Sequence, residues 1–325
     1  MGFLYSQIVE TRKLPYPAAS CYGRTVVITG SNTGLGKEAA RHYARLGASR
    51  LILAVRDLQK GFAAKQDIEH TAAKNTIIDV WLLDMASYES VKAFCGRLDT
   101  ELDRVDIFHA NAGVIPVRFS MTEGNETTIT VNFISTFLLV AMVLPKLRAT
   151  AEELSVRPNL VITSSGAHKH TTFPQQREDM IFKALNDADY ANGVYWKEQY
   201  PISKLLGILA LRRIAGVHPA DSYPVTINLV SPGLCYSELA REAQGFDRFA
   251  FQAMQALLAR STEQGSRTLI HAGLAGPESH GQYLEDCGIA ELSSVFISDK
   301  GLQDRVWRDL RDELEKISPG VTRNF

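Results

Sequence analysis

Short runs of apolar, often β-branched residues alternate along this chain with longer stretches in which apolar residues recur every three or four positions. The short runs are typical of strands buried on both faces, and the longer pattern is typical of amphipathic helices. Strands are predicted over residues 25–29, 50–55, 76–83, 105–110, 159–164 and 225–230. The clearest intervening helices are predicted over residues 35–46 and 87–102.

This alternation predicts a single doubly wound, Rossmann-type α/β domain over residues 1–325. Right-handed helical crossovers between parallel strands place helices on both faces of a mostly parallel sheet, for which we expect seven strands. Two stretches depart from the alternation of strands and helices, near residues 166–198 and 234–262. Each follows the carboxyl end of a predicted strand. Because open α/β sheets bind ligands at that edge, we expect both to be insertions over the substrate site.

Bulk composition narrows the class of partner and the compartment. The chain has 35 Lys and Arg against 36 Asp and Glu, a net charge of −1, so no overall field attracts nucleic acid or an acidic membrane. A small-molecule substrate is expected instead. The four cysteines lack CxxC spacing, which argues against a disulfide framework or a zinc site and favours a reducing, cytoplasmic location.

No apolar segment is long enough to predict a membrane span. The longest, residues 131–144, falls short of the roughly 20 residues that a spanning helix needs, so it predicts a buried helix. No charged-then-apolar leader is found, so secretion is not expected. The first residues, MGFLYS, match the N-myristoylation pattern at Gly2, although docking of a terminal segment through its apolar side chains is the simpler interpretation.

A glycine-rich turn follows the first predicted strand and opens the first long helix. Glycine there lets the backbone turn tightly and approach a pyrophosphate, while the unpaired N–H groups of the helix attract the anion. A tight turn without a ligand is the alternative, which the position at a strand-to-helix junction makes less favoured. The predicted phosphate-binding residues are Gly30, Ser31, Asn32, Thr33, Gly34, Leu35, Gly36 and Lys37.

The end of the second predicted strand indicates which dinucleotide binds. An acidic side chain there would bond the ribose 2′-hydroxyl of NAD(H), whereas Arg56 stands there and would attract the 2′-phosphate of NADP(H). NADP(H) is therefore the predicted cofactor, and Lys37 adds charge nearby. A solvated side chain remains the alternative for both Arg56 and Lys37.

The next two strand ends supply further candidate cofactor contacts. Asp84 is predicted to accept from the adenine amino group, and Met85 to cover a face of the ring. Residues Asn111, Ala112 and Gly113 would let the backbone approach the cofactor, although this tripeptide also suits a simple turn.

Tyr200 and Lys204 form the candidate proton-transfer pair. Positions i and i+4 lie on one face of a helix, and a nearby ammonium stabilises the anion of a phenol whose ordinary pKa is about 10. Pro201 is predicted to lie in the first turn of this helix, where it costs no hydrogen bond. A surface Tyr/Lys pair is the alternative, yet Tyr190 and Tyr195 have no lysine at i+4.

Two upstream segments complete this candidate site. Ser164 and Ser165 stand at the end of a predicted strand, and a hydroxyl there beside the phenol would hold a substrate carbonyl oxygen. Asn132, in the long apolar helix, would extend the proton path through a water molecule. A satisfied buried amide is the alternative for Asn132.

Together these segments resemble the short-chain dehydrogenase/reductase family in its shorter, one-domain form. Within that family, the chain is similar to the retinol dehydrogenase and WW-domain oxidoreductase branch. Over its whole length, the sequence looks most like fungal reductases of secondary metabolism. The motifs lie in family order over roughly residues 22–240. They are Thr29-Gly30-x3-Gly34-x-Gly36, Asn111-Ala112-Gly113, Asn132, Ser165, Tyr200-x3-Lys204 and Ser231-Pro232-Gly233.

The resemblance implies a role for each matched residue. Tyr200 would be the general acid and base, Lys204 would lower its pKa and bond the nicotinamide ribose, and Ser165 would position the carbonyl. Asn132 would organise the proton relay. Further implied cofactor contacts are Pro232, Gly233, Leu234 and Ser237, the last standing where the family usually has a threonine. Ala110 stands where many members have another asparagine, which is a mild departure.

The interval from Ser165 to Tyr200 is longer than the family pattern leads us to expect. Its aromatic residues favour a bulky, planar or polycyclic substrate, since aromatic faces supply area and stacking. No third metal ligand accompanies His168 and His170, so no metal site is predicted and both are expected at a pocket edge or on the surface. The aromatic residues are Phe173, Tyr190, Tyr195 and Trp196, and residues 246–260 are expected to form a mobile lid.

The principal hypothesis is an NADPH-dependent reductase of a bulky hydrophobic or aromatic ketone or aldehyde, which is an alcohol dehydrogenase in reverse. One alternative is a dinucleotide-binding sensor or scaffold without turnover, and another is a synthase that shapes a reactive intermediate after reduction. The apolar helices around Asn132 and after Tyr200 also suit the seam of a homodimer or homotetramer. Burial against the sheet explains them equally well.

Overall fold

The computed structural model describes residues 7, 10–115, 118–236, 255–292 and 296–325, with the backbone alone for residues 10, 12 and 189–197. Its elements are η1 (Glu10–Lys13), β1 (Thr25–Thr29), α2 (Gly34–Arg45), β2 (Arg50–Val55), α3 (Leu58–Glu69), β3 (Ile77–Leu82), α4 (Tyr88–Glu101), β4 (Ile107–Ala110), β5 (Met121–Thr122), β6 (Asn125–Glu126), α5 (Thr127–Ile129), η2 (Thr130–Ile134), α6 (Ser135–Leu154), β7 (Asn159–Thr163), η3 (Gly166–His170), η4 (Pro174–Arg177), α7 (Ile181–Leu185), α8 (Ala188–Val217), β8 (Thr226–Ser231), α10 (Thr262–Gly273), η5 (Pro277–Ser279), β9 (Tyr283–Glu285), β10 (Gly288–Ile289), α11 (Lys300–Ile317) and η6 (Val321–Asn324).

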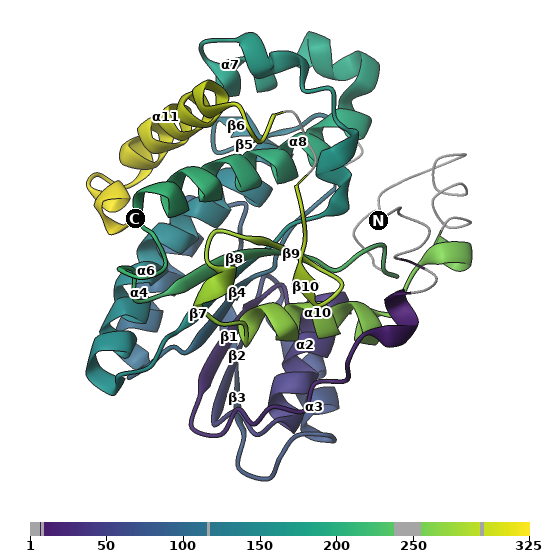
Figure 1. Cartoon of the computed structure of the whole chain (residues 1–325), viewed down its shortest axis with the longest axis vertical. Helices are drawn as coiled ribbons and strands as arrows, with labels where there is room; N and C mark the ends of the chain where they lie inside the picture. The colour runs from purple at the N-terminus through teal and green to yellow at the C-terminus, as the bar shows by residue number, and fades with distance from the viewer. Residues whose placement is uncertain (1–6, 8–9, 116–117, 237–254, 293–295) are drawn as a thin grey trace.

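An eight-stranded sheet in the order β10-β9-β8-β7-β4-β1-β2-β3 runs through the molecule (Figure 1). The pairs from β9 to β3 are parallel, and the two-residue β10 runs antiparallel to β9. The prediction of a mostly parallel, doubly wound sheet is confirmed, with β10 as an addition. Because β2 and β4 flank β1 on opposite sides, the chain reverses direction across the sheet at β1, where ligands of such folds bind.

Helices cover both faces of the sheet. Helices α2, α3 and α10 build the core on one face, and α4, α6, α8 and α11 build the core on the other. Neighbouring residues of β2 face opposite cores, since Leu51 belongs to the first and Ile52 to the second. Burial on both faces explains why the strands read as continuous apolar runs in the sequence.

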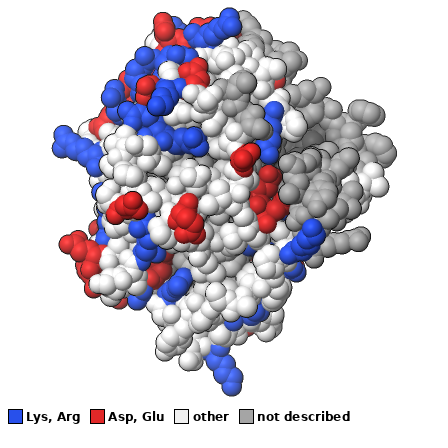
Figure 2. Space-filling model, viewed as in Figure 1, with Lys and Arg blue, Asp and Glu red and all other residues white. Residues whose placement is uncertain are grey.

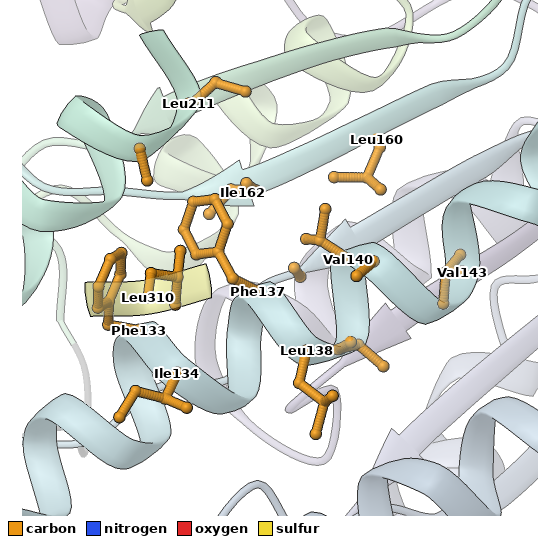
Figure 3. Packing of buried hydrophobic residues seen from close by; sticks show 14 of the residues in the cluster. Phe133, Ile134, Phe137, Leu138, Val140, Val143, Leu160, Ile162, Leu211 and Leu310 are labelled. Atoms are coloured by element: carbon orange, nitrogen blue, oxygen red, sulfur yellow. The ribbon is translucent and has the colours of Figure 1, made fainter. Parts of the chain in front are cut away.

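The most apolar helical segment of the described chain is Thr127–Leu154, which comprises α5, η2 and α6. It is long and apolar enough to cross a membrane, but 89% of its most apolar window is buried inside the protein. Phe133 and Phe137 pack edge to face with ring centres 5.2 Å apart, close to Ile162 and Leu310 (Figure 3). The segment is therefore the central helix of one core, as the sequence predicted.

The insertion near residues 166–198 is largely helical and contains η3, η4, α7 and the first turns of α8. The prediction that Pro201 begins its helix is wrong, because Pro201 lies in the interior of α8. A proline there withholds one backbone hydrogen bond. The insertion supplies extra helical turns before Pro201, so the helix starts earlier than the family-like segment alone indicated.

The C-terminal elements lie against α6 and α8 (Figure 1). The ring of Phe325 is 5.2 Å from that of Trp307 and 6.5 Å from that of Phe137, measured between ring centres. Basic and acidic side chains are interspersed over the face that includes α11 (Figure 2). The amphipathic α11 thus covers apolar surface of the core and presents charge to solvent.

Candidate active site

Ser165, Tyr200 and Lys204 come together at the carboxyl edge of the sheet. Ser165 lies two residues after the end of β7 and directly precedes η3, which packs against α8. Tyr200 and Lys204 lie on α8, and the ammonium of Lys204 donates to the carbonyl of Thr163 at the end of β7, at 2.9 Å. The structure therefore assembles the three residues that the sequence singled out.

The hydroxyl of Ser165 is oriented by its own turn. Its oxygen accepts from the backbone N–H of Ala167 at 3.1 Å and so caps η3. This contact leaves the hydroxyl proton to be donated, and the hydroxyl lies close enough to the phenol of Tyr200 to act on the pKa of that phenol. A serine held in this way can donate to the oxygen of a substrate carbonyl placed beside the phenol.

Burial governs the charge of both partners on α8. It raises the pKa of Tyr200, and the hydrogen bond from Ser165 offsets part of that rise. It also lowers the pKa of Lys204 to about 8. The expected lowering of the pKa of Tyr200 by Lys204 is not observed, because the ammonium lies 5.6 Å from the phenol ring centre and is directed to Thr163.

Asn132 is a satisfied buried amide in the π-helical turn η2. Its side chain accepts from the N–H of Val114 and donates to the carbonyl of Val114, both at 2.9 Å, and donates to the hydroxyl of Ser203 at 3.2 Å. The amide therefore fixes the chain after β4 against α8. A part for Asn132 in a proton relay stays a prediction.

The glycine-rich turn fits a pyrophosphate at one position in particular. Gly34 has φ of +59°, and no described atom lies within 4 Å of where its Cβ would be, so it borders open space. Thr33 precedes α2 with an extended backbone and no side-chain cap, which leaves the first N–H groups of the helix available to an anion. Ser31 faces inward and donates to the carbonyl of Ile28 at 2.9 Å.

The glycines on either side of Gly34 serve close packing of the backbone. A Cβ on Gly36 would lie 2.5 Å from the carbonyl oxygen of Gly30 and 2.7 Å from Nδ2 of Asn111. A Cβ on Gly30 would lie 3.0 Å from Cα of Ala112. The turn and the end of β4 thus touch directly, which fixes the position of Gly34 in the turn.

Asn111 joins the ends of three strands, β1, β4 and β7, by hydrogen bonds. Its side chain donates to the carbonyl of Thr29 at 2.9 Å and accepts from the hydroxyl of Thr163 at 3.2 Å. The hydroxyl of Thr29 in turn accepts from the backbone N–H groups of Asn111 and Ala112 at 2.9 Å. Thr163 was not among the predicted site residues, although β1 and β7 both end in Ile-Thr, a repetition that could have identified it.

The amino-acid sequence is similar to those of known dehydrogenases. A family model described as short chain dehydrogenase matches residues 24–174. The chain is 54% identical over 330 residues to the short chain dehydrogenase/reductase dmxR8 of Cryptosporiopsis sp. (strain 8999), with full coverage of both chains. It is 39% identical to the short-chain dehydrogenase anuD of Penicillium roqueforti, with 99% of this chain and 84% of that protein covered. The chain belongs to the short-chain dehydrogenase/reductase family.

Solved structures of low sequence identity share the fold of this short-chain dehydrogenase/reductase. A Pseudomonas aeruginosa RhlG/NADP active-site complex matches with a TM-score of 0.61, 20% identity and coverage of 83% of this chain and 97% of that one. A putative short chain dehydrogenase from Escherichia coli CFT073 complexed with NADPH matches with a TM-score of 0.59, 22% identity and coverage of 83% and 99%. These likenesses confirm the Rossmann-like architecture.

The predicted cofactor-specificity residues of this dehydrogenase/reductase differ in environment. Arg56 is exposed at the end of β2. Lys37 forms an ion pair with Asp67 at 2.6 Å, and its hydrogen bond is the main cause that lowers the pKa of Asp67 to about 2. Arg56 is thus open to a ligand, whereas the charge of Lys37 is partly neutralised within the protein.

The adenine-side candidates lie at the end of β3. Asp84 is half-buried and accepts from the N–H of Ala86 at 3.0 Å through one carboxylate oxygen, so the other remains for a ligand. Met85 packs in the core with 6% of its surface exposed, which is less open than a residue expected to cover a ring. Contact of either residue with adenine stays a prediction.

The loop after β8 is described through Tyr236. Pro232 is buried, Gly233 has φ of +74° and Leu234 is half-buried. Ser237, the lid residues 246–254 and the side chains of Tyr190, Tyr195 and Trp196 lie outside the described part of the chain. Their roles in the site stay predictions.

The expectation that both histidines of the insertion lie at a pocket edge or on the surface is wrong for His168. His170 is exposed, but His168 is buried, with its Nδ1 2.7 Å from the carbonyl oxygen of Ser165 and its ring 5.1 Å from that of Tyr283. Burial lowers the pKa of His168 to about 4, so it is neutral and its Nδ1–H donates. His168 therefore supports the turn that holds Ser165, a role that its spacing did not reveal. Within the described residues no cluster of His, Cys, Asp or Glu could hold a metal ion.

Proposed function

We propose that this oxidoreductase uses NADPH to reduce the carbonyl of a bulky hydrophobic or aromatic ketone or aldehyde, and that it catalyses the reverse oxidation of the alcohol. The observation that carries the proposal is the assembly of Ser165, Tyr200 and Lys204 next to the strand end that contacts the glycine-rich turn. A binding protein without turnover has no need of a phenol placed beside a serine hydroxyl and a lysine ammonium.

The proposed chemistry assigns one task to each of these side chains. A nicotinamide dinucleotide, when bound, supplies or accepts the hydride. Ser165 donates a hydrogen bond to the carbonyl oxygen, and Tyr200 gives its proton to that oxygen as negative charge develops. Because burial keeps Tyr200 protonated, the residue stands in the acid form that reduction requires. Lys204 has two further N–H donors beyond its bond to Thr163, and these suit ribose hydroxyls.

The proposed substrate class rests on the aromatic content of the insertion, which favours a bulky apolar substrate. Phe173 of that insertion belongs to the core instead, because it is fully buried against Phe296 with ring centres 6.0 Å apart. The relatives from Cryptosporiopsis and Penicillium are short-chain dehydrogenases of fungi, which favours a step in fungal secondary metabolism. The described cysteines are free, in keeping with a cytoplasmic protein.

The decisive experiment compares the wild-type protein with Tyr200→Phe. We expect wild-type protein to oxidise NADPH with at least one member of a panel of aromatic ketones, quinones, steroids and retinal. Tyr200→Phe should lose at least about 100-fold in kcat, because the proton donor is gone, and should keep its affinity for NADP+. Equal turnover in the two proteins would contradict the assignment.

The same assays separate the alternatives. A sensor or scaffold would bind NADP+ and oxidise no NADPH with any substrate of the panel. A synthase would retain part of its control over product distribution when NADPH is withheld and the reduced intermediate is supplied.

Preference for NADPH is assigned to Arg56. We expect Arg56→Ala to raise the KM for NADPH by about tenfold or more, because a charge-assisted contact with the 2′-phosphate is lost, and to leave the KM for NADH unchanged. Lys60→Ala removes another exposed cation nearby, on α3, and serves as the control. An equal effect on both cofactors, or the same effect from Lys60→Ala, would contradict a specific phosphate contact.

A further inference from the structure

Two side chains that are distant in sequence converge on the loop that follows β8. The buried amide of Gln7, in the N-terminal segment, donates to the carbonyl of Leu234 at 2.8 Å and accepts from the N–H of Leu234 at 3.2 Å. The same amide nitrogen donates to the carbonyl of Leu258 at 3.0 Å. Gln7 thereby satisfies both backbone polar groups of one loop residue, as a neighbouring strand would.

The guanidinium of Arg260 joins the same loop to two other segments. It donates to the carbonyl of Pro232 at 3.3 Å and to the hydroxyl of Thr11 at 2.6 Å, and it forms an ion pair with Asp286 in the turn between β9 and β10. The side chain of Arg260 is 0% exposed. An arginine so deeply buried requires these partners, because an unpaired buried charge is strongly unfavourable.

The backbone of Arg260 adds to this arrangement. Its N–H donates to the carbonyl of Leu234 at 2.9 Å, and its carbonyl accepts from the N–H of Tyr236 at 3.0 Å. Arg260 therefore pairs with residues 234–236 as a parallel β-bridge centred on Cys235, and Gln7 shares the carbonyl of Leu234 with it.

Gly233 shows how closely these groups approach the loop. A Cβ at this position would lie 2.6 Å from Oε1 of Gln7 and 2.9 Å from Nη1 of Arg260. Its φ of +74° also lies in the left-handed region that favours glycine. The loop is thus pressed against both side chains.

We propose that Gln7 and Arg260 are positioning residues of the cofactor site, which hold the Pro232–Leu234 backbone in the conformation that receives the nicotinamide half of the dinucleotide. The inference rests on the proposed function, since it takes this loop as the nicotinamide contact. It extends the site to the N-terminal segment, more than 200 residues away in the sequence. A loop that is already ordered loses less conformational entropy when the cofactor binds, and it aligns the nicotinamide ring for hydride transfer.

The test uses two ligands that share the adenine half. NADP+ reaches the loop, whereas 2′-phospho-ADP-ribose lacks the nicotinamide. We expect Gln7→Ala in the full chain to weaken NADP+ binding by about tenfold, and to change the affinity for 2′-phospho-ADP-ribose by less than about twofold. Calorimetric titration of both ligands gives the two dissociation constants.

A second variant distinguishes hydrogen bonding from mere filling of space. Gln7→Glu keeps the size and the acceptor but cannot donate to the carbonyls of Leu234 and Leu258, so it should weaken NADP+ binding as Gln7→Ala does. Hydrogen exchange of the peptide that contains Leu234 should also become faster in both variants, because the N–H of Leu234 loses its acceptor or its ordered position.

Arg267→Met is the matched control. Arg267 binds the same N-terminal segment, through the carbonyl of Leu14 at 2.9 Å and over the ring of Tyr16, and its other partner is Glu263 on α10 rather than the loop. Its NADP+ affinity should stay within about twofold of wild type. Arg260→Lys, which keeps the charge but not the forked geometry, should behave as Gln7→Ala does.

Several results would overturn the inference. Equal weakening of both ligands by Gln7→Ala would mean a general loss of stability, and unchanged NADP+ affinity would mean that the loop needs no such support. A full effect from Arg267→Met would mean that any loosening of the N-terminal segment suffices. If wild-type protein bound neither ligand, the proposed function itself would fail, which these other outcomes leave intact.

Discussion

At the residue scale, the ammonium of Lys204 lies 5.6 Å from the ring centre of Tyr200 and donates to the carbonyl of Thr163. Removal from water disfavours the charged form of both side chains, so the pKa of Tyr200 rises and that of Lys204 falls to about 8. Ser165 is the group whose hydrogen bond favours the phenolate. The proton chemistry of the site therefore depends on burial and on Ser165 before any ligand enters.

The lowered pKa of Lys204 predicts a pH dependence of cofactor binding. Below pH about 8 the side chain is charged and attracts the anionic dinucleotide, and above that pH the attraction is lost. We expect the affinity for NADP+ to fall by about tenfold as pH rises from about 7 to about 9.5. Calorimetric titrations across this range measure it. Lys204→Met should bind weakly at every pH, and a flat profile for wild-type protein would contradict the prediction.

At the scale of elements, the site depends on how the turn between β1 and α2 meets the end of β4. The two touch at Gly36, where a Cβ would approach the carbonyl of Gly30 to 2.5 Å and the amide of Asn111 to 2.7 Å. Backbone atoms cannot move aside as a flexible side chain can. The junction is therefore held by the absence of a side chain at Gly36 together with the hydrogen bonds of Asn111 to Thr29.

Adding one methyl group at this junction should disturb both stability and binding. We expect Gly36→Ala to lower the free energy of unfolding by about 1–3 kcal/mol and to weaken NADP+ binding by about tenfold, because the turn must move away from β4. Gly96→Ala is the control, since no described atom lies within 4 Å of its added Cβ and it lies inside α4. That variant should gain about 0.5–1 kcal/mol from helix propensity. Urea unfolding measures both, and equal changes would contradict the packing argument.

At the scale of the whole molecule, the C-terminal α11 completes the core on one face of the sheet. Leu302, Val306, Leu310 and Leu314 are buried along one side of α11, opposite its charged side. The apolar surface of α6 and α8 is therefore buried, at least in part, by the C-terminal elements of the same chain. The homodimer or homotetramer predicted from those two helices stays a prediction, which light scattering of purified protein can test.

The contribution of α11 to stability can be measured at Leu310. Leu310 is 0% exposed and lies near Phe133 and Ile134 (Figure 3). We expect Leu310→Ala to lower the free energy of unfolding by about 2–5 kcal/mol, the usual cost of a cavity in a core. Leu154→Ala, at a position 42% exposed, should change it by less than about 0.5 kcal/mol. Similar losses in the two variants would show that α11 is not part of the cooperative core.

The sequence alone determined the features that depend on short-range order. Six of the parallel strands, the turn at Gly30–Gly36 and the pairing of Tyr200 with Lys204 follow from periodicities and spacings of a few residues, which backbone geometry converts directly into structure. The three-residue β9 was not located in advance, because so short a run carries almost no periodic signal.

Only the tertiary structure decided which distant groups meet and how water is excluded from them. The pairing of Lys37 with Asp67, the burial of His168 behind Ser165 and the contact of Gln7 with Leu234 join positions that no local pattern relates. The rise in the pKa of Tyr200 and the fall in that of Lys204 also depend on contacts between distant parts of the chain. The cost of a charge depends on the atoms packed around it, and those atoms come from elements that only the complete fold brings together.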